Sequence, residues 1–461
     1  MSEPRSTIFA LASGAGRAGV AVFRVSGPDA GKVLDKLAGE RPEPRRATLK
    51  SLHAPGSNEA FDQGLVLWFP GPDSFTGEDV AELHLHGGRA VAAAATTALL
   101  TAGATPAGPG EFTRRAFENG KFDLTQAEAI ADLVEAETEA QRAQAARQLE
   151  GELGRICDRW RSALIDIIAQ VEADIDFPDE GDVAAAAGDG LADRTAAALA
   201  SLEADMTASL DDNHRGERVR EGLRVAIIGA PNVGKSAFLN RLVAREAAIV
   251  HHVPGTTRDV VEAHLSLGGQ LVNVSDTAGL RQTSDPIEAE GVRRARARAQ
   301  EADLRIAVAD ATRPDTALAF IDLLQDGDVV WVNKTDLASA ITTASTIQSR
   351  LEALHVERQA DVRAGSAKSG AGFDALVALL AGRVAVDPGP VEAAPLTRAR
   401  HREALTRARD ALRRARPKLA TSAELAGEDL RLAARALGEI TGRVDVEDVL
   451  DRVFASFCIG K

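Results

Sequence analysis

The pattern of apolar and polar residues changes along the first part of the chain. From the start to about residue 121, short apolar runs such as Val20–Phe23 and Leu65–Phe69 are separated by Gly and Pro turn signals. This pattern predicts an α+β domain built from short strands. Between Asp123 and Asp176, Pro and Gly become rare and apolar residues fall at helical spacing, which predicts amphipathic helices of a bundle.

A different pattern begins at Leu223, where apolar segments alternate with helical ones. That alternation predicts a parallel sheet with crossover helices, ending near Val384. A proline-rich linker and a last helical region, at about 396–457, follow it. Because helical sequence lies on both sides, we predict that the α/β segment is inserted into a helical domain. The four segments interpreted as strands are Val225–Ile228, Val272–Val274, Ile306–Ala309 and Val329–Val332.

These patterns predict a multidomain fold class: an α+β N-terminal domain, a helical domain and an inserted α/β domain. The expected boundaries place the N-terminal domain at residues 1–121 and the first part of the helical domain at 122–215. The inserted domain takes residues 216–384, and the second part of the helical domain takes 385–461. A chain of 461 residues is long enough for about three domains.

Composition narrows the classes of function. Lys and Arg number 54 against 68 Asp and Glu, a net charge of −14, so any contact with RNA is expected to be local or supplied by a partner. The arginine-rich start of the last helical region is interpreted as a solvated helix face, in preference to an RNA-facing or partner-facing patch. No apolar run reaches about 18 residues and no signal peptide is evident, so we expect a cytoplasmic protein without membrane contact.

The cysteine content excludes two further classes. With only Cys157 and Cys458, the chain has neither a disulfide scaffold nor a four-cysteine zinc site, and it suits a reducing compartment. Cys157 lies in a helical stretch beside Ile156 and Trp160, and we interpret it as a packing residue.

The strongest chemical signal is the segment Gly229–Ser236, which fits the phosphate-loop pattern. It follows an expected strand and precedes an expected helix, the context that the pattern requires. Its glycines allow backbone N–H groups to wrap phosphates at a helix N-terminus. The Lys235 ammonium neutralises phosphate charge, and the Ser236 hydroxyl reaches Mg²⁺.

Further motifs follow in the order of a GTPase domain. A threonine of Thr256–Thr257 can complete the magnesium shell, while Asp276 can hold Mg²⁺ through water and Gly279 can bind the γ-phosphate. In Asn333–Asp336, the aspartate can accept hydrogen bonds from guanine N1–H and the exocyclic amine, a pair that adenine lacks. A backbone N–H of Ser366–Lys368 can meet the guanine oxygen. The segment therefore resembles the G domain of the translation-factor class of GTPases.

One catalytic group of Ras-type GTPases is missing. Leu280 follows Gly279 at the place where those proteins carry a glutamine that orients water. Gln282 lies two residues further on, and we do not expect it to serve. Hydrolysis therefore needs another source of positive charge and another group that positions water.

Several motifs together resemble those of the MnmE family, also called TrmE, whose members are GTPases that modify the wobble uridine of tRNA. The most specific are the phosphate loop, Gly255–Asp259, Asp276–Arg281 and the terminal Phe457–Lys461. Further segments that resemble the family's sequences are Ser74–Asp79, Pro109–Phe112, Gln126–Asp132 and Asp176–Glu180. The resemblance spans Arg24 to Lys461, and it departs from the family pattern in the unusual loop at His251, His252 and Pro254.

The resemblance implies sites for three cofactors. A tetrahydrofolate derivative, 5-formyl- or methylene-tetrahydrofolate, would be bound by Arg24, Glu82, Lys121 and Lys461. Potassium would be held by Asn232, His251, Val253 and Thr256, and Mg²⁺ by Ser236 and Thr257. The full set expected to contact GTP is Asn232, Val233, Gly234, Lys235, Ser236, Ala237, His251, Thr256, Thr257, Asp276, Thr277, Ala278, Gly279, Asn333, Lys334, Asp336, Ser366, Ala367 and Lys368.

The resemblance also implies catalytic residues, partners and a reaction. Glu288 matches the family's water-positioning glutamate, and Cys458 matches a cysteine proposed to act in the modification chemistry. The expected protein is a potassium-activated GTPase that forms a homodimer and a heterotetramer with an MnmG-type flavoprotein. The two proteins would add a 5-carboxymethylaminomethyl or aminomethyl group to the wobble uridine of certain tRNAs, with FAD on the partner only.

Two other readings of the G domain stay open at this point. One is an Era-type GTPase that binds RNA directly and acts in ribosome assembly, although the acidic total charge and the Cys458-containing terminus argue against it. The other is a signalling GTPase whose flanking regions bind protein effectors.

Overall fold

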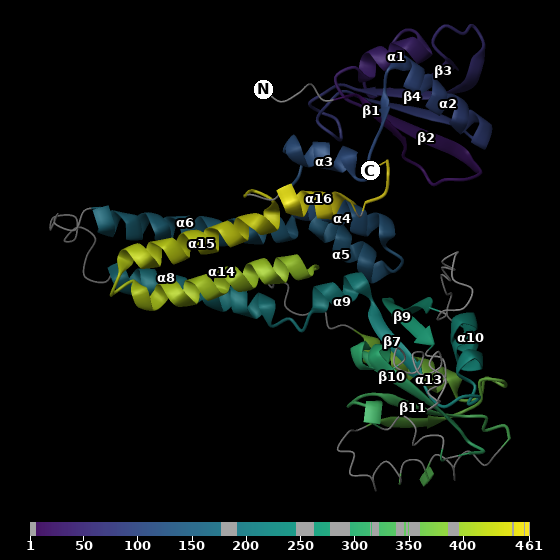
Figure 1. Ribbon diagram of the computed structural model, residues 1–461, viewed down its shortest axis with the longest axis vertical. Helices are drawn as coiled ribbons and strands as arrows, with labels where there is room; N and C mark the ends of the chain where they lie inside the picture. The colour runs from purple at the N-terminus through teal and green to yellow at the C-terminus, as the bar shows by residue number, and fades with distance from the viewer. Residues whose placement is uncertain are drawn as a thin grey trace, which may run out of the picture. The chain divides into compact units, whose positions relative to one another are not determined.

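The computed structural model describes most of the chain, as two compact units. The described residues are 6–176, 191–245, 262–276, 296–313, 315, 322–337, 345–346, 349, 360–385, 396–444, 447–455 and 457–460. The first unit comprises Met1–Val134, Gln148–Ala204 and Glu403–Lys461, and the second comprises Glu135–Arg147 and Asp205–Arg402 (Figure 1). In the described part, no helix is long and apolar enough to cross a bilayer.

The first unit begins with a six-stranded sheet in the order β3-β4-β5-β2-β1-β6. Only the β1–β6 pair is parallel, and the other neighbours are antiparallel. The strands are β1 (Ile8–Leu11), β2 (Ala18–Ser26), β3 (Thr48–His53), β4 (Ala60–Phe69), β5 (Val80–Gly87) and β6 (Thr105–Pro106). The predicted α+β class is confirmed, but the prediction of short strands is wrong for β2, β4 and β5, which have 9, 10 and 8 residues.

Two helices, α1 (Ala30–Ala38) and α2 (Arg89–Ala102), cover one face of this sheet. Apolar residues at alternate strand positions, among them Phe23, Val66 and Leu83, are buried beneath them. On the strands the intervening residues point to the other face, where Phe112 and Phe75 pack against Ile8 and Ala10 of β1. Three large apolar side chains remain exposed on these strands: Val20 at 52%, Leu49 at 59% and Leu65 at 42%.

The rest of the first unit is helical, as the spacing of apolar residues predicted. The long helices α6, α8, α14 and α15 run side by side (Figure 1), and α15 packs along α6. The helices are α3 (Glu111–Glu118), α4 (Leu124–Glu135), α6 (Glu152–Asp176), α8 (Leu191–Leu210), α14 (Ala399–Lys418), α15 (Ala423–Thr441) and α16 (Glu447–Ala455). Cys157 is buried within α6, which fits its interpretation as a packing residue.

The arginines of α14 lie against acidic side chains of neighbouring helices. The pairs are Arg407 with Glu439, Arg413 and Arg416 with Glu203, and Arg414 with Asp429. These arginine side chains are about half exposed. Their charge is therefore offset within the helical bundle, which supports the solvated helix face over an RNA-facing patch.

The second unit contains a six-stranded sheet in the order β12-β11-β10-β7-β9-β8, parallel except for the β8–β9 pair. Its strands are β7 (Leu223–Ile228), β8 (Glu262–Leu267), β9 (Gln270–Asp276), β10 (Leu304–Asp310), β11 (Val329–Asn333) and β12 (Asp361–Ala364). All four predicted strands occur, as β7, β9, β10 and β11. The unit also contains α5 (Glu139–Leu149), part of which belongs to the first unit, and α9 (Arg215–Glu221).

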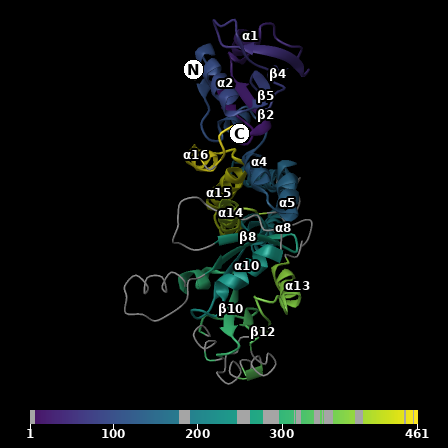
Figure 2. The ribbon, with the colours of Figure 1, turned by 90° about the vertical axis from the view of Figure 1, so that its right-hand side faces the viewer.

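Helices α10 (Lys235–Arg245) and α13 (Phe373–Val384) pack against one face of this sheet (Figure 2). The contact centres on three aromatic rings, Phe238 of α10, Trp331 of β11 and Phe373 of α13, whose centroids lie 5.0 to 5.8 Å apart. Strands β7, β10 and β11 are buried on both faces, as a parallel sheet between helical layers requires. This core fixes the carboxyl ends of the strands, where the phosphate-loop and guanine motifs lie.

Candidate functional site

The phosphate loop connects β7 to α10, the strand–loop–helix context expected for it. Lys235 is 7% exposed, and its Nζ donates hydrogen bonds to the carbonyls of Gly229 and Ala230, both at 3.1 Å. Gly234 has a φ of +100°, and a Cβ there would lie 2.4 Å from the Asn333 amide. The loop therefore requires glycine at this point. Asn232 and Ser236 are exposed, so their side chains are accessible to a ligand.

Asn333 joins three of the predicted motifs. Its side-chain amide donates to the carbonyl of Val233 at 2.9 Å, and its side-chain oxygen accepts from the backbone N–H of Ala367 at 2.9 Å. The residue is 3% exposed. One buried side chain thus holds the phosphate loop, the Asn333–Asp336 motif and the Ser366–Lys368 motif together.

Asp336 lies exposed beside the Ser366–Lys368 motif. A hydrogen bond from Ser366 is the main cause that lowers the pKa of Asp336, and the positive charge of Lys368 acts in the same direction. The backbone N–H of Thr335 donates to the carbonyl of Gly365 at 3.2 Å, which holds the two motifs side by side. An exposed carboxylate that stays ionised is the group that recognition of guanine requires.

Several predicted site residues lie outside the described residues. They are His251, Val253, Thr256, Thr257, Thr277, Ala278, Gly279, Glu288 and Lys461. Asp276 is the last residue of β9, which lies between β7 and the edge strand β8. Among the predicted GTP contacts, the structure brings together the phosphate loop, Asn333–Asp336 and Ser366–Lys368.

In the N-terminal domain, Arg24 of β2 and Glu82 of β5 are direct cross-strand partners. The guanidinium donates to Glu82 Oε1 from Nε at 3.1 Å and from a terminal nitrogen at 3.0 Å. It also lies 5.0 Å from the ring centre of Phe75 and 5.9 Å from that of Phe112. These two predicted folate ligands, 58 residues apart in the sequence, form one site with a cation, an anion and aromatic rings.

Lys121 lies at the loop that carries Phe75. Its Nζ donates to the carbonyl of Pro72 at 2.9 Å, and its side chain lies next to Gly77. The structure gives no direct contact of Lys121 with Arg24 or Glu82 among the interactions of the described residues. Lys121 and Arg24 therefore contact the same loop, at Pro72 and Phe75, without contacting each other.

The C-terminal tail lies against the N-terminal domain. Ile459 forms an antiparallel bridge with Pro109, and the N–H of Gly110 donates to the carbonyl of Cys458 at 3.4 Å. Gly460 has a φ of +102°, and a Cβ there would lie 2.5 Å from the carbonyl oxygen of Leu11. The tail therefore requires glycine at this position, and the docked tail leaves Cys458 exposed.

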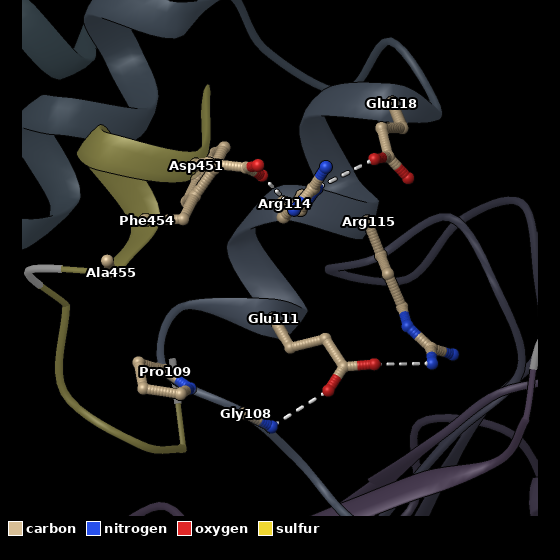
Figure 3. A pocket seen from close by; sticks show the side chains of 9 residues that line it. All are labelled: Gly108, Pro109, Glu111, Arg114, Arg115, Glu118, Asp451, Phe454 and Ala455. Atoms are coloured by element: carbon tan, nitrogen blue, oxygen red, sulfur yellow. Dashed lines mark hydrogen bonds and ion pairs between the residues drawn. The ribbon is translucent and has the colours of Figure 1, made fainter. Parts of the chain in front are cut away.

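A cavity of about 490 Å³ lies beside the turn that holds the tail (Figure 3). Glu111 spans that turn, because its carboxylate accepts from the N–H of Gly108 at 2.8 Å and from Arg115 at 2.7 Å. Arg115 is 5% exposed and also donates to Glu78 at 3.2 Å. Neither Glu111 nor Arg115 belongs to the sites predicted from the sequence, although Glu111 lies in the family-like segment Pro109–Phe112. The residues that line the cavity are Gly108, Pro109, Glu111, Arg114, Arg115, Glu118, Asp451, Phe454 and Ala455.

Comparisons with known proteins agree with this architecture. The family model described as the GTP-binding protein TrmE N-terminus matches residues 7–121, and the model for the MnmE helical domain matches residues 124–458. The tRNA modification GTPase MnmE of Maricaulis maris is 54% identical over 99% of this chain and 100% of its own length. The protein of the same name from Paramagnetospirillum magneticum is 54% identical over 100% of both chains.

A solved structure of Era from Aquifex aeolicus aligns over 41% of this chain and 66% of its own, with 26% identity and a TM-score of 0.30. Full-length similarity to the MnmE proteins favours their family over the Era-type alternative.

The phosphate loop joined to a guanine-recognition motif defines the class of P-loop GTPases. Within that class, the chain belongs to the MnmE family, whose curated relatives carry the name tRNA modification GTPase. The predicted fold class, with an N-terminal domain, a helical domain and a G domain, is confirmed.

Proposed function

We propose that this protein is a potassium-activated GTPase that acts with an MnmG-type flavoprotein on the wobble uridine of certain tRNAs. The product is a 5-carboxymethylaminomethyl or aminomethyl group, and a tetrahydrofolate derivative supplies the one-carbon unit. The similarity to MnmE proteins over the whole chain is the observation that carries the proposal. The net charge of −14 supports a flavoprotein partner that provides part of the tRNA contact.

The G domain supplies the hydrolysis of GTP, with Mg²⁺ as its metal ion. Ser236, the second residue of α10, and Thr257 are the proposed Mg²⁺ ligands. Asp336 is the proposed guanine reader, and Lys235 the proposed phosphate contact. Asn232, His251, Val253 and Thr256 are the proposed potassium ligands, and Glu288 positions the attacking water.

The N-terminal domain binds the folate derivative in this proposal, at Arg24, Glu82, Lys121 and Lys461. The Arg24 guanidinium suits an anionic part of a folate, the Glu82 carboxylate suits the hydrogen-bond donors of its pterin edge, and aromatic rings beside them suit a flat ring system. The docked tail supports a site at which Cys458 acts near the one-carbon unit.

The domain boundaries proposed from the sequence are residues 1–121, 122–215, 216–384 and 385–461. The family matches to residues 7–121 and 124–458 support the first of these boundaries. We propose a cytoplasmic location, where tRNA is available, and a flavin that is held by the partner only.

Loss of the modified nucleoside tests the function as a whole. Digested tRNA from cells that lack this chain is expected to lose the 5-substituted wobble uridine in nucleoside analysis by mass spectrometry. The wild-type chain and Cys157→Ala should restore it, because Cys157 serves packing. Cys458→Ser should not restore it, although its GTP hydrolysis stays at the wild-type rate. Unchanged nucleosides in the deletion strain would contradict the proposed function.

Folate binding is expected to depend on Arg24. Loss of its charged hydrogen bonds in Arg24→Ala should weaken binding of 5-formyl-tetrahydrofolate by roughly 10- to 100-fold in calorimetry. The control is Arg46→Ala, which removes an exposed arginine of the same domain that pairs with the exposed Glu43. Equal affinities for wild type and Arg24→Ala would move the folate site elsewhere.

The exposed part of the N-terminal sheet supports a homodimer. Leu49 and Leu65 lie opposite each other on β3 and β4, and both are exposed. Sedimentation without nucleotide should give a particle of about twice 48.4 kDa, and Leu49→Glu with Leu65→Glu should give a monomer. The control, Leu432→Glu, alters an exposed leucine of α15 and should leave the dimer intact. A wild-type monomer at micromolar concentration would contradict the homodimer.

A further inference from the structure

Among the described residues of the G domain, Asn232 and Lys334 are the two that adopt a left-handed backbone without being glycine, and they contact each other. Asn232 and Lys334 both have a φ of +64°. Lys334 Nζ donates to the carbonyl oxygen of Asn232 at 2.7 Å. Such conformations are uncommon outside glycine and persist where surrounding contacts hold them. The hydrogen bond from Lys334 thus links the guanine motif to the phosphate loop at the two residues whose backbones are in this uncommon conformation.

The carboxylate of Asp310 holds Lys334 in this position. Asp310 ends β10, pairs in register with Asn333 of β11 and is 1% exposed. Its Oδ2 accepts from Lys334 Nζ at 2.8 Å, while its Oδ1 accepts from the backbone N–H and the hydroxyl of Thr312 at 2.9 and 2.6 Å. Arg313 donates to Oδ2 at 3.3 Å. The carboxylate is therefore itself fixed by neighbouring donors.

Asp310 stays ionised over the physiological range. Burial alone would raise the pKa of Asp310, but the hydrogen bonds from Lys334 and Thr312 lower it to about 2. The fixed Asp310 carboxylate already restricts the long, flexible side chain of Lys334. Binding of the Asn232 carbonyl by Lys334 therefore costs less rotamer entropy than it would for an unrestrained lysine. Without that anion, the contact of Lys334 with the Asn232 carbonyl loses its main support.

We propose that Asp310 is a positioning residue for guanine nucleotide binding, which locks Lys334 onto the phosphate loop. Asn333 already binds the carbonyl of Val233, so two successive residues of the guanine motif hold two successive carbonyls of the phosphate loop. The contact of Asp310 with Lys334, and of Lys334 with the Asn232 carbonyl, holds the base-binding loop and the phosphate-binding loop together as one rigid unit. Its loss lets the two loops separate, and a nucleotide held by both then dissociates faster.

Asp328 provides a matched control in the same domain. It is a buried aspartate that pairs with the buried Arg305, and each side chain is 2% exposed. It lies just before β11, at the amino end of the strand, whereas Asp310 lies at the carboxyl end of β10 beside the phosphate loop. If Asp310 served stability alone, its replacement and that of Asp328 would affect nucleotide dissociation equally. A positioning role predicts that only the replacement of Asp310 accelerates dissociation strongly.

The test is the dissociation rate of a fluorescent GDP analogue from the full-length protein, with thermal unfolding measured on the same samples. Asp310→Asn and Lys334→Met should each accelerate dissociation by roughly 10- to 100-fold. The double variant should be no faster than the faster single variant, since both changes break the same contact. Asp328→Asn should lower the unfolding temperature without a comparable acceleration.

Three results would overturn the proposal: an unchanged dissociation rate in Asp310→Asn, accelerations that multiply in the double variant, or an equal acceleration in Asp328→Asn. If Asp310→Asn does not fold, Thr312→Val replaces it, because this change removes the hydroxyl that fixes the Asp310 carboxylate. Thr312→Val is then expected to accelerate dissociation of the GDP analogue several-fold. The same change should cause no further acceleration in a protein that already carries Lys334→Met. Dissociation at the wild-type rate, or an acceleration that persists in that background, would also overturn the proposal.

Discussion

Replacement of Asp336 by asparagine is expected to change the preferred nucleotide from GTP to XTP. The Asp336 carboxylate accepts hydrogen bonds only, as recognition of guanine N1–H and the exocyclic amine requires. An asparagine amide places a donor there, which opposes the guanine amine and suits the oxygen of xanthine. Loss of the charged contact should weaken GTP binding by about 2–5 kcal/mol.

Binding of GTP, XTP and ATP should be measured for the wild type and the variant by displacement of a fluorescent nucleotide. Asp374→Asn is the control, because Asp374 is an exposed aspartate at the start of α13 in the same domain. This control should keep the wild-type preference for GTP. Equal affinity of the wild type for ATP and GTP, or no gain of XTP binding in Asp336→Asn, would contradict the role of Asp336.

The G-domain sheet could be predicted in large part because its central strands are buried on both faces. Such strands are continuous apolar runs, as in Val329–Val332, and phosphate-loop and guanine motifs sit at their ends. Strands β8 and β12 were not predicted. They form the two edges of the sheet, and a polar sequence such as Asp361–Ala364 carries no comparable signal.

Contacts between distant residues set the limit of sequence analysis at both sites. Arg24 and Glu82 meet only because β2 pairs with β5 in one register, and composition or spacing does not specify that register. The resemblance alone pointed to this pair. Asp310 was not predicted as a functional residue either, because a single aspartate at the end of a strand forms no recognisable motif. Its role emerges from the ammonium of Lys334, 24 residues further along the chain.

GTP hydrolysis is expected to be fast in potassium and slow in sodium, and Asn232→Ala should abolish the difference. No glutamine directly follows Gly279, and no arginine of the G domain can be assigned from sequence as a source of charge. Such a charge contributes about 10³–10⁵ in rate when an arginine supplies it. Asn232 is exposed on the phosphate loop, two residues before Gly234, where its side chain is accessible to a cation beside the phosphates.

The cation's size decides the rate in this mechanism, because oxygen ligands at fixed positions suit one ionic radius. Turnover should be measured in potassium and in sodium at equal ionic strength for the wild type, Asn232→Ala and Asn240→Ala. Asn240 is an exposed asparagine of α10, and its variant should keep the wild-type dependence on potassium. Glu288→Ala should slow hydrolysis and leave GTP binding nearly intact, because its proposed role is to position water. Equal wild-type turnover in both salts, unaffected by Asn232→Ala, would remove the cation from the mechanism and require an arginine supplied by a second protein.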